Sequence, residues 1–188
     1  MLRGAYFDFM GKIMKLRMLC AATLPLALLA TTAKAESVPA AAMNKTVTVS
    51  FTATGNGKRP DGQTRAFNTQ VTRMIYISSA GRLFMRHQAS NQRGSRGGDF
   101  DPNDARQGKG SFHFQGNRLV GVIPYANGAR QITVSFDGSF SSCTASIIEG
   151  HSAGVIKRKG PDGVMYEITG ASTTAPSCSI QSGNAFGS

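Results

Sequence analysis

Three turn signals at regular intervals constrain the fold of this 188-residue chain more than any other feature. Glycine next to asparagine or aspartate tolerates the positive φ angles of tight hairpin turns. Such pairs occur at Gly116-Asn117, Asn127-Gly128 and Asp137-Gly138. Between the turns apolar and polar residues alternate, as at Ile132, Val134 and Phe136, with the period of a strand that has one buried face. Residues 111–148 therefore predict a four-stranded antiparallel meander.

Alternating segments continue on both sides of this meander. Residues 45–54 alternate over their whole length, and residues 67–78 with 82–88 predict a hairpin. Residues 154–159 with 164–169 predict another hairpin. About eight or nine short strands joined by tight turns must bury one common face. The sequence predicts an all-β fold, an antiparallel meander of about 8–9 strands in a small β-barrel, with a two-sheet β-sandwich as the alternative.

Residues 1–35 have the pattern of a secretory signal peptide. Lys15 and Arg17 precede an apolar run, and the small residues Ala33 and Ala35 occupy the −3 and −1 positions of a cleavage site. The alternative is a transmembrane anchor, but the run is shorter than the ~20 residues that a spanning helix needs. We therefore expect cleavage and export to the periplasm or the extracellular space.

The region upstream of this signal is unusual for a leader. Asp8 and several aromatic residues stand where a compact basic region belongs. Our hypothesis is that translation starts at Met14 and that residues 1–13 are a mis-assigned extension. After cleavage, we expect residues 36–188 to form a single β-domain without a transmembrane span.

Cys143 and Cys178 are the cysteines that remain after removal of the signal peptide. An even pair in an exported protein predicts a disulfide. Closing a loop of about 35 residues stabilises a fold by roughly 3–4 kcal/mol in the chain-entropy model. The bond would tether the C-terminal tail to the strand that contains Cys143. A metal site on two free thiols is the alternative, and it lacks further ligands at suitable spacing.

Residues 89–110 interrupt the strand pattern. Apolar residues do not alternate here, and the many glycines and charged residues oppose burial. This composition predicts a long flexible loop. The whole chain has 21 Lys and Arg against 10 Asp and Glu, a net charge of +11. We single out the basic residues of this loop and of a later basic run as anion-binding candidates: Arg93, Arg96, Arg106, Lys109, Lys157, Arg158 and Lys159.

A basic surface of this kind attracts anionic partners outside the cytoplasm. Anionic lipid head groups, lipopolysaccharide, acidic polysaccharide and extracellular nucleic acid are the classes we expect. The export signal argues against an intracellular nucleic acid. The alternative interpretation is a solvated surface that maintains solubility.

One motif suggests catalysis and is rejected because of its surroundings. Residues 150–154 read Gly-His-Ser-Ala-Gly and match the nucleophile elbow of α/β-hydrolases. That elbow needs a helix after the serine and a later histidine. Pro161 follows closely, and no histidine comes after His151. We therefore predict no catalytic residues.

A second motif resembles the start of a calcium loop. Asp99, Asp101 and Asn103 place oxygen ligands at alternate positions. Asp104 stands where that loop needs glycine, and Gly110 replaces the closing glutamate. We predict neither a metal site nor a cofactor.

Together these features predict an exported, non-catalytic β-domain that binds an anionic envelope or extracellular component through a basic surface. The sequence leaves its oligomeric state open. An enzyme whose catalytic residues are not contiguous in sequence is a third hypothesis. The alternative that we rank second is a carrier of a small apolar ligand, with a cavity inside the barrel lined by residues such as Phe112, Phe114, Ile132, Val134 and Phe136.

Overall fold

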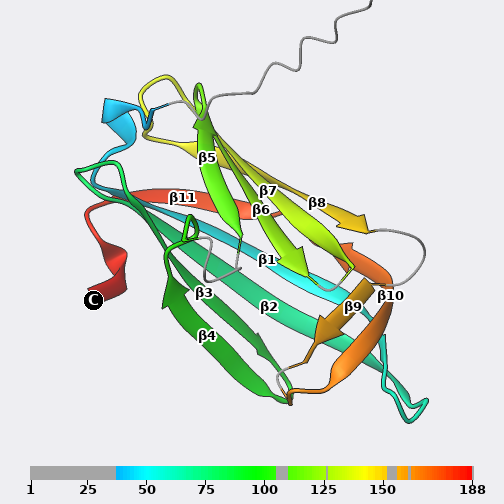
Figure 1. Cartoon of the computed structure of the whole chain (residues 1–188). Helices are drawn as coiled ribbons and strands as arrows, with labels where there is room; N and C mark the ends of the chain where they lie inside the picture. The colour runs from blue at the N-terminus through cyan, green and yellow to red at the C-terminus, as the bar shows by residue number, and fades with distance from the viewer. Residues whose placement is uncertain (1–36, 105–109, 126, 152–155, 161, 188) are drawn as a thin grey trace, which may run out of the picture. The chain divides into compact units, whose positions relative to one another are not determined.

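The computed structural model describes residues 37–104, 110–125, 127–151, 156–160 and 162–187. The predicted signal peptide lies outside these residues. Within them, eleven antiparallel strands form two sheets (Figure 1). Short 3-10 turns at η1 (Ala40–Ala42) and η3 (Ala185–Gly187) precede and follow the strands. No helix of the described part is long and apolar enough to cross a membrane.

The larger sheet is curled into a half-barrel, with strand order β4-β3-β2-β1-β10-β9, and β11 also pairs with β1. β1 and β2 are each 14 residues long and pair over their full length. On its other side, β1 pairs with β11 along its first half and with β10 along its second half. The strands of this sheet are β1 (Lys45–Lys58), β2 (Thr64–Ile77), β3 (Leu83–Asn91), β4 (Gly94–Phe100), β9 (Ile156–Lys159), β10 (Met165–Thr173) and β11 (Ser177–Ser182).

The smaller sheet is the predicted meander, with strand order β5-β6-β7-β8. Its strands are β5 (Ser111–Gln115), β6 (Arg118–Tyr125), β7 (Gly128–Phe136) and β8 (Cys143–His151). The antiparallel all-β fold is therefore confirmed. The strands are arranged as a half-barrel sheet and a separate four-stranded sheet, and they are more numerous than the sequence predicts.

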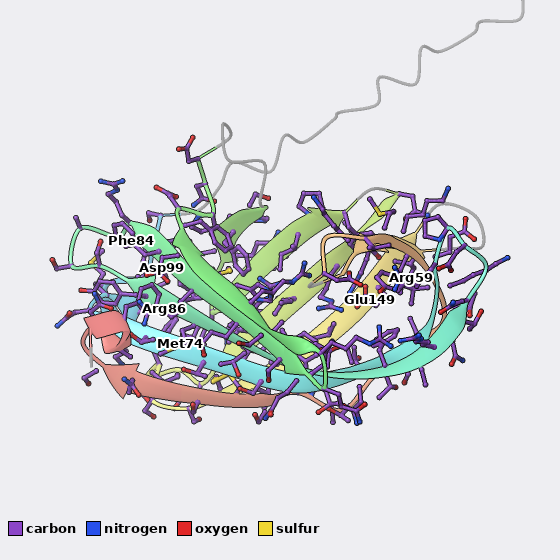
Figure 2. The ribbon with its side chains drawn as sticks, turned by 90° about the horizontal axis from the view of Figure 1, so that it is seen from below. Arg59, Met74, Phe84, Arg86, Asp99 and Glu149 are labelled. Atoms are coloured by element: carbon purple, nitrogen blue, oxygen red, sulfur yellow. A yellow bond between two sulfur atoms is a disulfide. The ribbon has the colours of Figure 1, made fainter. Side chains whose placement is uncertain are left out.

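Part of the predicted flexible loop over 89–110 is a strand. Residues 94–100 form β4, which pairs along its whole length with β3, and residues 89–91 belong to β3 itself. The loop prediction is therefore wrong for both segments. β4 is an exposed edge strand, so the backbone ladder holds it without any apolar alternation. Arg86 of β3 also binds Asp99 of β4 through two hydrogen bonds of 2.7 and 2.8 Å (Figure 2). Residues 105–109 lie outside the described part of the chain.

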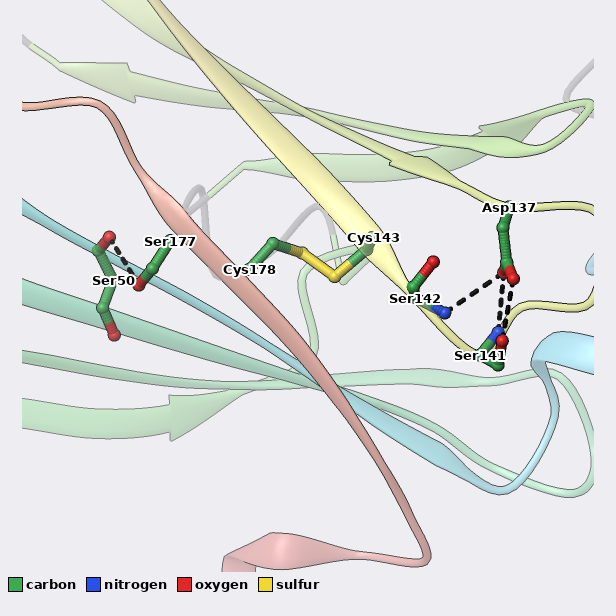
Figure 3. Close-up of a disulfide and its surroundings, with 7 residues drawn as sticks. All are labelled: Ser50, Asp137, Ser141, Ser142, Cys143, Ser177 and Cys178. Carbon is green, nitrogen blue, oxygen red and sulfur yellow. Dashed lines mark hydrogen bonds between the residues drawn. A yellow bond between two sulfur atoms is a disulfide. The ribbon is translucent and has the colours of Figure 1, made fainter.

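Cys143 of β8 and Cys178 of β11 form the predicted disulfide (Figure 3). The bond connects the smaller sheet to the larger one, with the two Cα atoms 5.6 Å apart. The C-terminal tail that it tethers is regular, because Cys178 lies opposite Val49 in the β1–β11 ladder. A disulfide is consistent with an oxidising, extracytoplasmic location.

The hydrophobic core lies between the two sheets. The side chains that the carrier hypothesis places around an empty cavity are buried in this core, so that placement is wrong: Phe112, Phe114, Ile132, Val134 and Phe136. They fill the space because the larger sheet packs directly against them, with Val47, Val49 and Ile75 in the same cluster.

We expect the disulfide to contribute substantially to the stability of the domain. The double variant Cys143→Ser/Cys178→Ser should lose roughly 3–4 kcal/mol of unfolding free energy, because its unfolded chain is no longer cross-linked. For a domain of this size that loss lowers the Tm by about 10 °C. Differential scanning calorimetry with and without reductant measures the shift. The double variant is the control, because reductant should leave its Tm unchanged. If reductant also leaves the Tm of the wild type unchanged, the prediction is contradicted.

Candidate anion-binding cavity

A cavity of about 400 Å³ lies between the two sheets, next to the hydrophobic core. Its volume is typical of sites for small ligands. Strands of both sheets contribute to its walls, and no Asp or Glu of the described part of the chain lines it. We call it the basic cavity, because eight Lys and Arg residues line it: Arg65, Arg73, Arg93, Arg96, Arg130, Lys157, Arg158 and Lys159.

The period of two in β2 explains how one strand supplies several lining residues. Alternate side chains of a strand point to the same face of the sheet. The β2 residues that line the basic cavity are all at alternate positions, and they combine charged, apolar and polar side chains: Arg65, Phe67, Thr69, Val71 and Arg73. The even-numbered residues between them face the outside of the curl.

Five of the seven predicted anion-binding residues line this cavity: Arg93, Arg96, Lys157, Arg158 and Lys159. The other two, Arg106 and Lys109, lie outside the described residues. β4 and β9 are the two edge strands of the half-barrel sheet. A hydrogen bond of 3.0 Å from Arg96 Nη1 to the carbonyl oxygen of Lys159 connects these edges. The curl of the sheet therefore brings together two basic segments that are far apart in sequence.

Three further arginines line the basic cavity: Arg65, Arg73 and Arg130. They are not among the anion-binding residues predicted from the sequence. Each is a single arginine within a strand, and single arginines on strands are usually solvated. The alternation of apolar and polar residues could have identified Arg73 and Arg130, because each occupies a position where its strand otherwise has an apolar residue. An arginine at such a position faces the interior of the fold.

Glu149 neutralises part of the charge beside the cavity. Its carboxylate accepts a hydrogen bond of 2.6 Å from Arg130 Nε and one of 2.8 Å from Arg158 Nη2. The hydroxyl of Tyr125 donates to it as well, at 3.2 Å, and the Arg158 guanidinium lies 4.5 Å from the centre of the Tyr125 ring. Glu149, labelled in Figure 2, thus forms ion pairs with two guanidinium groups at once.

Arg73 is buried without a counter-ion. It is 6% exposed, and no described carboxylate forms an ion pair with it. Its Nη1 donates to Met85 Sδ at 3.5 Å, a weak acceptor, and its buried Nε has no partner in the described structure. Burial, followed by the charges of Arg130, Arg158 and Arg96, lowers the pKa of Arg73 to about 9.

His87 lies next to Arg73, opposite it in the β2–β3 ladder. Burial and the nearby positive charges, first that of Arg73, lower the pKa of His87 to about 3. Its imidazole is therefore neutral at physiological pH. Its buried Nδ1 has no hydrogen-bond partner in the described structure. Buried polar atoms are normally satisfied, so Arg73 and His87 each have one buried polar atom that is an exception in the described structure.

The arrangement is suited to holding an anion. Within the described residues, no group of three or more His, Cys, Asp or Glu side chains could hold a metal ion. Most of the Gly-His-Ser-Ala-Gly motif at 150–154 lies outside those residues. A comparison of the chain with protein-family models, curated proteins and solved structures finds no match.

We expect Glu149→Gln to destabilise the domain although it adds no bulk. The substitution leaves Arg130, whose side chain is 5% exposed, without its carboxylate. Breaking a buried ion pair in this way costs about 3–5 kcal/mol. The matched control is Glu167→Gln, because Glu167 pairs with Lys157 at 3.8 Å on an exposed surface and should cost less than about 1 kcal/mol. Urea unfolding of both variants tests this, and equal stabilities would contradict the assigned role of Glu149.

Proposed function

We propose that this protein is an exported, non-catalytic β-domain that binds an anionic envelope or extracellular component at the basic cavity. The observation that carries the proposal is the composition of the cavity wall, which among the described residues has eight cationic side chains and no acidic one. Lipid head groups, lipopolysaccharide and acidic polysaccharide are the partner classes that fit this charge. The signal peptide pattern and the disulfide support an extracytoplasmic site of action.

The balance of charge around the cavity supports an anion as its ligand. Arg73 is subject to the repulsion of Arg96, Arg130 and Arg158, and among the described residues Glu149 is the acidic group that acts on it in return. Guanidinium groups held this close repel one another, and their partial burial strengthens the repulsion. A bound anion would offset the repulsion and accept charge-assisted hydrogen bonds.

A carrier of an apolar ligand remains the second candidate, and one observation favours it. The basic cavity also has apolar lining residues on β1, β2, β3, β6 and β10, among them Val71, Ala89, Ile123 and Ile168. Any apolar ligand would therefore occupy the same cavity rather than the core between the sheets. The two candidates differ in whether charge or apolar contact dominates the affinity.

Binding to anionic vesicles tests the proposed function. Wild-type protein should bind phosphatidylglycerol vesicles and not phosphatidylcholine vesicles, and binding should weaken strongly between about 0.05 and 0.5 M salt through screening. Lys157 and Lys159 are exposed residues of the basic cavity. Each cation near an anionic surface contributes about 1 kcal/mol, so Lys157→Gln/Lys159→Gln should weaken binding at least tenfold.

The matched control removes the same charge elsewhere. Arg82 and Arg118 are exposed and do not line the basic cavity, so Arg82→Gln/Arg118→Gln should change the Kd by less than about threefold. Soluble heparin serves as a second anionic probe that contains no lipid. If neither probe binds at low salt, or if both double variants weaken binding equally, the proposed function is wrong.

A further inference from the structure

Charge and apolar surface are separated along β2. Arg73 and Val71 are both buried, Phe67 is half-buried and Arg65 is exposed. At about 3.3 Å per residue, Arg73 and Arg65 are roughly 26 Å apart along the strand. Along β2, the wall of the basic cavity therefore has a buried cation at its inner end, a largely apolar stretch, and an exposed cation at its mouth. On the neighbouring strands, Arg96 is opposite Ala89 in the β3–β4 ladder.

The apolar stretch is continuous across several strands. Val71 is opposite Ala89 in the β2–β3 ladder, and residues of β1, β6 and β10 complete it. We call this surface the apolar strip: Ala53, Phe67, Val71, Ala89, Ile123 and Ile168.

Glycines of β1 keep aromatic rings close to the sheet beside this strip. A Cβ atom at Gly55 would lie 2.9 Å from the Phe67 ring, and one at Gly57 would lie 3.0 Å from the Tyr166 ring. Both rings therefore pack closely against the backbone of β1. With small side chains at Ala53 and Ala89, this packing contributes to the open volume of the cavity.

At the inner end, the adjacent Arg73 and His87 provide unused polar atoms. Arg130, by contrast, already donates to Glu149. Arg73 Nε and His87 Nδ1 are both buried and unpartnered in the described structure. A guanidinium group donates two parallel hydrogen bonds to a carboxylate or phosphate group, and a neutral imidazole can add a third donor.

We propose that the ligand is a single-chain amphiphile whose anionic head group binds Arg73 and His87 at the inner end of the basic cavity, with its alkyl chain along the apolar strip. This inference rests on the proposed function and specifies its ligand class. A small inorganic anion would leave the apolar strip in water. An acidic polysaccharide would bring hydroxyl groups against a surface that has few partners for them. The reverse orientation would place an alkyl end against the unpartnered polar atoms of Arg73 and His87.

Isothermal titration calorimetry with four probes tests the head group and the chain separately. The probes are dodecanoate and dodecyl phosphate below their micelle concentrations, dodecanol as the uncharged chain, and acetate as the head group alone. Dodecanoate or dodecyl phosphate should bind at least tenfold more tightly than dodecanol and far more tightly than acetate. The stronger of the two anions identifies the head group as a carboxylate or a phosphate.

The decisive variant is Arg73→Met, which retains an unbranched side chain up to the position of Nε and removes the charged guanidinium group. It should weaken binding of the anionic amphiphile about 10- to 100-fold and leave dodecanol binding unchanged. Arg73→Lys should recover part of the loss, because it restores charge without the planar fork. Ala89→Leu, which fills the apolar strip, tests the position of the alkyl chain independently. It should weaken dodecanoate binding and leave acetate binding unchanged. Thermal unfolding of each variant confirms that it is folded.

The outcomes separate this inference from the proposed function. If Lys157→Gln/Lys159→Gln weakens vesicle binding while no single-chain amphiphile binds, the inference is wrong and the proposed function stands. If dodecanoate binds and Arg73→Met has no effect on it, the head group does not bind Arg73 and the inference is also wrong. If vesicles, heparin and all four small probes fail to bind, both proposals are wrong.

Discussion

The full-length pairing of β1 with β2 is the constraint on which the rest of the structure depends. Both strands have 14 residues, whereas the strands of the smaller sheet have five to nine. One end of the β1–β2 ladder is therefore covered by the smaller sheet and forms the hydrophobic core. The other end contributes its inward side chains to the basic cavity. The cavity results from this difference in strand length, together with the curl that brings β4 and β9 together through Arg96 and Lys159.

The basic cavity contains a buried arginine that has no carboxylate partner in the described structure. A buried guanidinium group normally has a carboxylate partner, as Arg130 has in Glu149. Arg73, on the same face of β2 as the core residues Val71 and Ile75, has a thioether sulfur instead. An apolar residue at this position would avoid the cost of the unpaired charge, and the ligand that we propose would give that charge a role. In this account the domain gives up stability at Arg73 and recovers it when the ligand binds.

The sequence predicts those parts of the molecule whose signal is local. The meander over 111–148 follows from alternation and turn dipeptides, and the Cys143–Cys178 bond follows from an even cysteine pair. β4 was missed because an edge strand exposed on both faces needs no apolar pattern. For the same reason its glycines and charges resembled those of a flexible loop.

The basic cavity could be predicted only in part, because it is assembled from strands distant in sequence. Composition identified Arg96 and the basic run at 157–159 as candidates, but the proximity of these segments depends on the curl of the sheet. Arg73 was not among the predicted candidates, because the sequence does not show that no carboxylate lies opposite it. Its position among the alternating apolar residues of β2 is the signal that could have identified it.

The most direct test of the central claim is native mass spectrometry of the protein recovered from its own exported fraction, without reductant. The account predicts a protein with its disulfide intact that retains one anionic molecule, or takes one up from a lipid extract of the same cells. Release of that molecule by substitution of Arg73 would place it in the basic cavity. A bound molecule that is neutral or cationic, or a protein that stays bare in the extract, would contradict the account.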